Sequence, residues 1–259
     1  MAPPYYVGDM ENLLLSGERL NKINENLSLI EYTGGLTFGT DAYLLAAFVK
    51  GGHKKLVDLG SGTGVASLLC LAKNKTKTAY AAEIQERYAS LIERNGRLNG
   101  FEDRLKVLCG DIRELTSTMT EGEADAVISN PPYFRNTDGF DCKTDEKSIA
   151  RRELNGTIYD FAAAAARLLK FGGTFYTVYR PDRAAELIHA LKENGLEPKR
   201  MLTVYPDTKS KPCLVLVESR KGGSPALIMD RPLFIYKDGT REHTADMEKI
   251  YEECAIWTK

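Results

Sequence analysis

Several residue types and patterns are scarce in this chain of 259 residues, and each absence excludes a class of protein. The five cysteines are an odd number with no Cys-x-x-Cys pair, so we expect reduced thiols rather than a disulfide framework. The histidines, His53, His189 and His243, lack the spacing of metal ligands, and we predict no metal site. No hydrophobic run approaches the length of a membrane span, and residues 1–25 lack the apolar region of a secretion signal. We therefore expect a cytoplasmic protein without membrane contact.

An excess of one charge sign is also missing, because 35 Lys and Arg residues balance 36 Asp and Glu residues at a net charge of -1. No global field therefore draws the chain to nucleic acid. Local basic clusters do occur, and a stripe built from some of them would neutralise a few phosphates. Their members are Lys50, Lys54, Lys55, Lys73, Lys75, Lys77, Arg151, Arg152, Lys199, Arg200, Lys209, Lys211, Arg220 and Lys221. The alternative is that each cluster is a solvated helix or loop face.

A strand, a glycine-rich loop and a helix follow one another in the first third of the chain. Lys55–Val57 reads as a short strand, and Asp58-Leu59-Gly60-Ser61-Gly62-Thr63-Gly64 precedes an apolar helical stretch. Glycines let the backbone approach a ligand closely, and the N–H groups of a helix N-terminus suit a carboxylate or phosphate. A dinucleotide fingerprint needs glycine at the sixth loop position, which counted from Gly60 is Val65. A dehydrogenase is therefore disfavoured.

Acidic residues end the next two predicted strands. Thr76–Ala82 is closed by Glu83, about 20 residues beyond the glycines, where a carboxylate usually takes ribose hydroxyls. Arg104–Cys109 alternates polar and apolar residues, and Asp111 follows it. Each carboxylate alone is more often a solvated strand-end residue. Because the carboxyl ends of the strands form the ligand crevice of an open α/β sheet, we expect Asp58, Glu83 and Asp111 to face one ligand.

The segment Ser129-Asn130-Pro131-Pro132-Tyr133 follows residues 125–128, which read as a buried strand. Two prolines forbid the strand to continue, so the backbone must turn at its carboxyl end. An amide, a carbonyl on a stiffened peptide and an aromatic ring then lie side by side. Such a set can accept hydrogen bonds from a planar NH2 group while the ring stacks on the same plane, which suits the amino group of adenine. The alternative is a polar turn, because Asn-Pro steps are common turn signals.

These motifs together resemble those of class I S-adenosylmethionine-dependent methyltransferases that act on amino nitrogens. Gly17–Leu20, Phe38–Leu45 and Pro232–Tyr236 extend the resemblance to the bacterial tRNA(Val) adenine-37 N6-methyltransferase family, over nearly the whole chain. It implies S-adenosylmethionine as cofactor, RNA (foremost tRNA) as partner, and adenine N6 as methyl acceptor. The catalytic residues that it implies are Asn130, Pro131, Pro132 and Tyr133. The cofactor-binding residues would be Thr40, Asp41, Asp58, Gly60, Ser61, Gly62, Thr63, Gly64, Glu83, Ile84, Asp111, Ile112 and Asn130.

The order of elements indicates a doubly wound, Rossmann-like α/β sheet of seven strands, the last antiparallel, with a small N-terminal hairpin and helix extension. Residues 1–50 would form this extension and residues 51–259 the methyltransferase domain. Residues 27–30 and 36–38 are expected to pair around Thr33-Gly34-Gly35, and Thr40 with Asp41 to cap a helix over 42–49. Further helices are predicted at 85–98, 157–170 and 182–194, with a strand at 174–179. Residues 201–205 and 213–218 would be the last two strands, antiparallel because their loop is too short for a crossover.

The identity of the acceptor stays open at this level. The related ribosomal-RNA guanine-N2 and protein-glutamine N5 methyltransferases share the same motif logic, and a non-catalytic module for RNA or a partner is a further alternative. We rank tRNA adenine first, another RNA base second, a protein amide third and the module last. The polar segment 134–156, directly after Tyr133, is hypothesised to be a lid that orders on substrate binding. The oligomeric state is open, with a monomer favoured.

Overall fold

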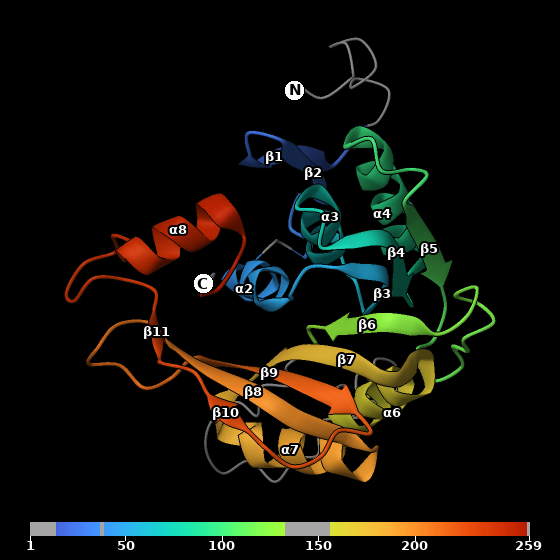
Figure 1. Ribbon diagram of the computed structural model, residues 1–259. Helices are drawn as coiled ribbons and strands as arrows, with labels where there is room; N and C mark the ends of the chain where they lie inside the picture. Colours follow the sequence, from blue (N-terminus) through green and yellow to red (C-terminus); the bar gives the residue numbers. More distant parts are fainter. Residues whose placement is uncertain (1–13, 37–38, 133–155, 258–259) are drawn as a thin grey trace, which may run out of the picture.

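The main body of the protein is one mixed sheet with helices on both faces (Figure 1). The computed structural model describes residues 14–36, 39–132 and 156–257. Within them the sheet has the order β10-β8-β9-β7-β6-β3-β4-β5, and β11 also pairs with β8. Its strands are β3 (His53–Leu59), β4 (Thr76–Glu83), β5 (Leu105–Cys109), β6 (Ala124–Ser129), β7 (Leu169–Tyr179), β8 (Leu196–Tyr205), β9 (Leu214–Lys221), β10 (Ile228–Met229) and β11 (Leu233–Phe234). The Rossmann-like α/β fold is confirmed, and β10 and β11 add two short strands to the seven expected.

The direction of the strands brings the carboxyl ends that carry the predicted site residues to one edge of the sheet. β3, β4, β5, β6 and β7 pair in parallel, so their carboxyl ends meet at the same edge of the sheet. β9 runs antiparallel to both of its neighbours, β7 and β8. The predicted antiparallel pairing of the last two long strands is therefore confirmed, and the loop from β8 to β9 lies at that same carboxyl edge.

The helices cover the two faces of the sheet and bury two large cores, and a third, smaller cluster consists of Ile30, Tyr88, Leu91 and Leu98. They are α2 (Thr40–Phe48), α3 (Val65–Ala72), α4 (Glu86–Leu98), α6 (Ile158–Leu168), the 3-10 turn η1 (Pro181–Arg183), α7 (Ala184–Glu193) and α8 (Ala245–Glu253). α2 and α3 share one core with Ala126 and Ile128 of β6, whereas α6 and α7 share the other with Val127. Successive residues of β6 face opposite sides of the sheet, and helices cover both sides. Ala126, Val127 and Ile128 are therefore all apolar, and they read as a continuous hydrophobic run.

The N-terminal hairpin differs from the prediction. β2 (Leu27–Tyr32) pairs with the preceding segment, β1 (Glu18–Asn24), whereas residues 37 and 38 of the predicted partner segment lie outside the described residues. The turn between them is favoured by the Asn24 side chain, whose oxygen accepts from the backbone N–H of Asn26 at 2.9 Å. The hairpin rests on α4, where Arg94 donates to both carboxylate oxygens of Glu18 at 2.6 Å. A turn also forms after β2, where the Gly35 N–H donates to the Tyr32 carbonyl at 3.0 Å, so both turn signals of this region are used. The division into domains at residue 50 stays a prediction.

The helix predicted at 157–170 ends early, at Leu168. Leu169 already pairs with Ala124 of β6, and a β-bulge follows before Thr174. A Cβ atom on Gly173 would lie 2.9 Å from the carbonyl oxygen of Lys170, so only glycine fits there. The Gly172-Gly173 pair, interpreted as a helix stop, belongs to this bulge. The strand predicted at 174–179 therefore starts earlier, and α7 begins at Ala184, two residues later than predicted.

No helix of the described ranges has both the length and the apolar character needed to cross a bilayer.

Candidate active site

The loop between β3 and α3 turns through three left-handed glycines. Gly60, Gly62 and Gly64 have φ angles of 72°, 57° and 81°, which side chains other than hydrogen rarely adopt. Their surroundings differ. A Cβ on Gly64 would lie 3.0 Å from Cγ2 of Ile92, whereas a Cβ on Gly62 would have Leu36 as its nearest neighbour at 3.8 Å. Gly62 therefore leaves room for a ligand, and Gly64 lets α3 pack closely against α4.

Asp58, at the end of β3, is a buried carboxylate with 2% of its surface exposed. Its Oδ2 accepts from the Ser67 hydroxyl at 2.8 Å, and the Ser61 hydroxyl donates to its backbone carbonyl at 2.9 Å. Burial raises the pKa of Asp58 to about 6, and the negative charge of nearby Glu83 adds to the rise. A buried carboxylate with a raised pKa gains most from a cationic partner, such as the ammonium group of an amino acid.

Glu83, at the end of β4, joins two loops. Its Oε2 accepts from the backbone N–H of Gly62 at 2.9 Å, and its Oε1 accepts from the N–H of Gln85 at 3.0 Å. These bonds fix both oxygens at the edge of the sheet. Since a carboxylate has about four acceptor positions, two remain for the hydroxyls of a ligand.

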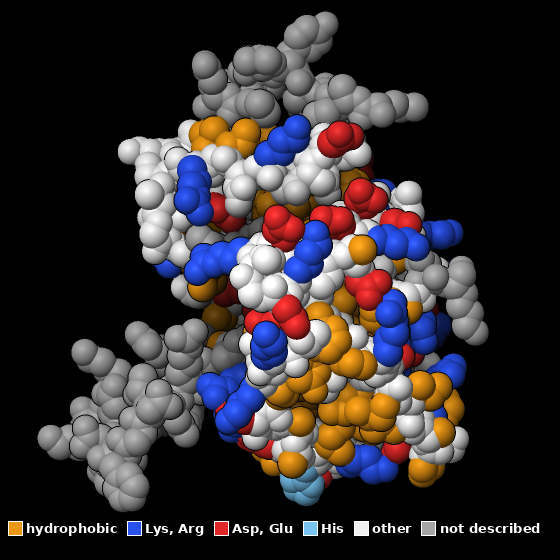
Figure 2. Space-filling model, turned by 90° about the vertical axis from the view of Figure 1, so that its left-hand side faces the viewer, with side chains coloured by type: hydrophobic (Ala, Val, Ile, Leu, Met, Phe, Trp, Pro, Cys, Tyr) orange, Lys and Arg blue, Asp and Glu red, His pale blue; other side chains and the backbone are white. Residues whose placement is uncertain are grey.

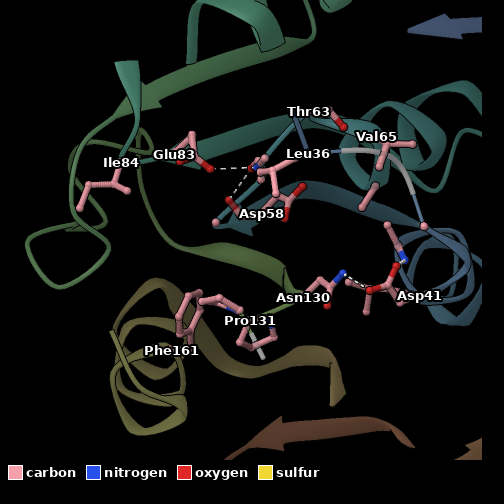
Figure 3. Close-up of a pocket in the computed structure, with 18 of the residues that line it drawn as sticks. Leu36, Asp41, Asp58, Thr63, Val65, Glu83, Ile84, Asn130, Pro131 and Phe161 are labelled. Atoms are coloured by element: carbon pink, nitrogen blue, oxygen red, sulfur yellow. Dashed lines mark hydrogen bonds between the residues drawn. The ribbon is translucent and has the colours of Figure 1, made fainter. Parts of the chain in front are cut away.

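Asn130 and Asp41 meet from elements that are distant in sequence. Figure 3 shows the two side chains directed toward each other, with Asn130 Nδ2 donating to Asp41 Oδ2 at 3.0 Å. The predicted capping role of Thr40 and Asp41 is wrong, because the N-cap of α2 is Gly39 and makes no side-chain cap bond. Instead, Asp41 Oδ1 accepts from the backbone N–H of Ala42 at 2.8 Å, and its Oδ2 accepts from Asn130. Pro131 is buried and Pro132 is exposed.

A cavity of about 370 Å³ joins these features at the carboxyl edge (Figure 3). Its volume is within the range of small-molecule and cofactor pockets. The predicted site residues in its wall are Asp41, Asp58, Gly60, Ser61, Gly62, Thr63, Glu83, Ile84, Ile112, Asn130, Pro131 and Pro132. Residues from the ends of β3, β4 and β6 and from α2 thus surround one space.

Three predicted residues lie outside this wall, namely Thr40, Gly64 and Asp111. The Asp111 carboxylate is bound by the side chain of Arg113 and accepts from its backbone N–H at 2.8 Å. The Arg113 hydrogen bonds hold the pKa of Asp111 below its usual value. Tyr133 and residues 134–155 of the hypothesised lid lie outside the described residues. The ligand roles of Asp111 and Tyr133 stay predictions.

Sequence reasoning missed eight residues of the wall. They are Leu36, Gly39, Ala42, Leu45, Val65, Ala66, Gln85 and Phe161. Val65 and Ala66 form the first turn of the helix behind the glycines, and Gln85 follows Glu83 closely, so the motifs themselves pointed to these three. Nothing local marks Phe161, on α6, or Leu36, because only the packing of distant elements brings them to the cavity.

The wall fits a nucleoside joined to an amino acid. Glu83 suits ribose hydroxyls, the apolar side chains of Ile84, Ile112 and Phe161 suit a planar base, and Asp58 suits an ammonium group. In the parts of the chain that the structure describes, no group of three or more His, Cys, Asp or Glu side chains could hold a metal ion. Glu83, Asp58 and the apolar side chains of the wall together fit S-adenosylmethionine.

Most of the predicted basic clusters serve the fold. Lys75 is buried, and its ammonium group donates to the carbonyls of Ala46, Ala47 and Val49 at 2.7, 3.1 and 2.7 Å. Lys50, Lys55, Lys73, Lys199, Arg200, Arg220 and Lys221 likewise bond to backbone carbonyls or carboxylates. Lys209 and Lys211 are exposed in the loop at the carboxyl edge. Arg151 and Arg152 lie beyond the described ranges.

The face of the molecule shown in Figure 2 carries charges of both signs. In Figure 2, which shows the left-hand side of the view in Figure 1, Lys and Arg side chains alternate with Asp and Glu, and hydrophobic side chains gather toward the α7 end of the molecule. The mixed charge agrees with the neutral composition. An attraction of this face for polyanions must therefore come from a few local cations.

Solved structures share this fold at low sequence identity. A predicted O-methyltransferase from Agrobacterium tumefaciens has a TM-score of 0.68 at 22% identity, covering 85% of this chain and 99% of its own. The Pyrococcus horikoshii TYW2 in complex with MeSAdo has a TM-score of 0.57 at 16% identity, covering 81% of this chain and 73% of its own. These likenesses establish the Rossmann-like methyltransferase architecture.

The sequence pattern of the family described as "Methyltransferase small domain" matches residues 33–194, which is more than half of the chain. With the fold and the cavity, the match defines an S-adenosylmethionine-dependent methyltransferase, as expected from the motifs. The chain belongs to the methyltransferase small domain family.

Curated relatives narrow the resemblance. A tRNA1(Val) (adenine(37)-N6)-methyltransferase from Bacteroides thetaiotaomicron is 33% identical, over 69% of this chain and 74% of the relative. A protein of the same name from Haemophilus influenzae is 26% identical, over 80% of this chain and 85% of the relative. The resemblance to this group of RNA-modifying enzymes is thereby confirmed.

Proposed function

We propose that this protein transfers a methyl group from S-adenosylmethionine to N6 of an adenine in RNA, and that the adenine is position 37 of tRNA(Val). The observation that carries the proposal is the placement of Asn130 in the wall of the cavity that the glycine loop and Glu83 also line. The names of the curated relatives support the choice of RNA and of adenine.

The cofactor supplies an electrophilic methyl group on a sulfonium that leaves as a neutral thioether. The positive charge passes from the sulfonium to N6, which becomes neutral again by releasing one N6–H proton to solvent, so the protein has little acid–base chemistry to perform. Its task is to raise the nucleophilicity of the acceptor and to align it. The N6 lone pair of adenine is delocalised into the ring, so a planar amino group is a poor nucleophile.

Hydrogen bonds from N6–H to the side-chain oxygen of Asn130 and to the Pro131 carbonyl would favour a pyramidal nitrogen with an available lone pair. They would be strongest in the transition state, where the nitrogen becomes cationic. Pro131 and Pro132 stiffen this turn, so the two acceptors are fixed before the base arrives. The ring of Tyr133 would stack on the base and compensate it for leaving the RNA stack.

Lys209 and Lys211 are the members of the predicted basic clusters that we assign to RNA. Both are exposed and lie in the β8–β9 loop at the carboxyl edge, the edge at which the cavity opens. A few such cations would hold a tRNA through its phosphates in a salt-dependent way.

Mass spectrometry of nucleosides tests the proposal. Purified protein is incubated with unmodified tRNA or ribosomal RNA and with isotope-labelled methyl donor, and the RNA is digested. We expect labelled N6-methyladenosine from tRNA(Val), and none when guanosine replaces the adenosine at position 37 of that tRNA. Labelled N2-methylguanosine from ribosomal RNA, or label on glutamine of a protein, would replace the proposal with those acceptors. No binding of S-adenosylhomocysteine in calorimetry would leave only a non-catalytic module.

A further inference from the structure

The contact between Asp41 and Asn130 has a chemical consequence for the acceptor site. Asp41 lies in the first turn of α2 and Asn130 follows β6, so 89 positions separate them. Both side chains line the cavity, and the Asn130 amide nitrogen donates to the Asp41 carboxylate at 3.0 Å.

An ionised carboxylate can only accept hydrogen bonds, so it must face the NH2 side of the amide. The amide oxygen is attached to the same planar carbon and therefore points away from Asp41. Rotation of the amide by half a turn would exchange the two groups, and the terminal torsion of asparagine permits both orientations. The carboxylate removes this ambiguity.

We propose that Asp41 is a positioning residue, which locks the amide of Asn130 so that an acceptor rather than a donor faces the methyl-accepting amino group. The inference rests on the function proposed above and assigns one determinant of its acceptor class. A reversed amide would present NH2 to the substrate NH2, and the two donors would repel. The negative charge also polarises the amide, which makes its oxygen a stronger acceptor as the substrate nitrogen becomes cationic.

The surroundings hold Asp41 in place. A Cβ atom on Gly39 would lie 2.4 Å from Oδ1 of Asp41, so the glycine leaves the space that this carboxylate occupies. Gly39 has a φ of -113°, which any residue adopts, and thus only the space requires glycine. At the other end of α2, buried Lys75 binds three backbone carbonyls at the close of the helix. Residues 42–48 are all buried, so the helix that carries Asp41 is fixed along its length.

Four variants of the full-length protein test the lock: Asp41→Ala, Gly39→Ala, Asn130→Asp and the exchange Asp41→Asn with Asn130→Asp. We expect Asp41→Ala to lower kcat by about 10- to 100-fold, in line with the loss of one oriented hydrogen bond. Gly39→Ala displaces the carboxylate without changing its chemistry and should lower kcat in the same direction. The dissociation constant of S-adenosylhomocysteine, measured by calorimetry, should change less than about threefold.

The exchange variant separates positioning from general structural support. Asn130→Asp alone places two carboxylates in contact and should be nearly inactive. In the exchange variant, the amide at position 41 donates to the carboxylate at position 130, whose second oxygen again faces the substrate, so kcat should recover at least tenfold. No recovery of kcat would overturn the proposal. A loss in Asp41→Ala that lies entirely in cofactor affinity would also overturn it and would make Asp41 a cofactor ligand.

A second measurement does not depend on which acceptor is methylated. Hydrogen exchange of the Asn130 side-chain NH2 protons, followed by NMR, should be slow in the wild-type protein and fast in Asp41→Ala. Equally fast exchange in both would overturn the lock. Wild-type protein that methylates another amino group would refute only the proposed substrate, because the kinetic comparison is then made with that acceptor.

Discussion

The two halves of the cavity are built by different kinds of contact. In the glycine-loop half, residues 58–64 with Glu83, the hydrogen bonds span short distances in sequence: 2, 9 and 21 residues for Glu83 to Gln85, Asp58 to Ser67 and Glu83 to Gly62. In the acceptor half, Asp41 with residues 130–132, the decisive bond spans 89 residues. The cofactor end is therefore assembled largely by one βαβ unit, whereas the acceptor end exists only when α2 docks on the completed sheet.

The largest effect should come from the acceptor half. Replacement of Asn130 by alanine removes the hydrogen-bond acceptor that is strongest in the transition state, and kcat should fall by about 10²- to 10³-fold. Affinity for S-adenosylhomocysteine should stay nearly unchanged, because this end of the cavity faces the acceptor. Steady-state kinetics with tRNA and calorimetry with S-adenosylhomocysteine give the two quantities. An unchanged kcat would remove Asn130 from the chemistry.

Asp58→Asn, in the glycine-loop half, should lower the affinity for the cofactor rather than kcat. Loss of a charged partner for the ligand's ammonium should weaken S-adenosylhomocysteine binding by roughly 10- to 100-fold at pH 8. The wild-type protein should also bind more weakly as the pH falls below about 6, because Asp58 is then protonated. The variant should lack this pH dependence, and calorimetry at pH 5 and pH 8 distinguishes the two proteins.

The same variant should be more stable than the wild type without ligand. The pKa of Asp58 rises on folding from 3.8 to about 6, so the folded state binds the proton more tightly than the unfolded state. The contribution of this group to stability is therefore greatest below about pH 4 and is lost as the pH rises to about 6. At pH 8, Asp58→Asn should raise the free energy of unfolding by up to about 3 kcal/mol. An equal gain at pH 4 would contradict the burial of charge as the cause.

Gly64→Ala should separate rigidity from ligand contact within the glycine-loop half. The left-handed backbone and the contact of a new Cβ with Ile92, at 3.0 Å, should lower the free energy of unfolding by about 2 kcal/mol or more. Gly239→Ala is the matched control, because its φ of 72° is similar and nothing lies within 4 Å of a new Cβ. It should cost about 1 kcal/mol. Equal losses in urea titrations would show that contact with Ile92 is unimportant.

The smallest effect should come from the exposed β8–β9 loop, which lies at the same edge of the sheet as the cavity. Replacement of Lys209 and Lys211 by alanine should weaken tRNA binding about three- to tenfold and lower the slope of log K against log salt by about 1 to 2. Lys54 and Lys77 form the matched control pair, since both are exposed near the starts of β3 and β4, at the opposite edge. Their replacement changes the net charge equally. An equal loss of tRNA affinity would place the RNA elsewhere.

Features built by local contacts could be predicted from the sequence, and features built by contacts between distant elements could not. The strand, loop and helix around Asp58 to Gly64 were predictable, because glycines with positive φ and a carboxylate at a strand end act through local geometry. The pairing of β2 with β1 was not predicted, because turns form on both sides of β2, at Asn24 and at Gly34, and local signals do not say which neighbour pairs with it. The glycines after Leu168 belong to a bulge that exists only opposite β6.

Local backbone preferences account for the alternation of strands and helices, the glycine loop and the break after Ser129, since each depends on a few neighbouring residues and can be read from the chain alone. Packing between distant elements chose which side chains share the cavity. It joined Asp41 to Asn130, added Phe161 and Leu36 to the wall, and bound most predicted basic residues within the fold. The reason is that such choices depend on distances between elements, which no local preference encodes.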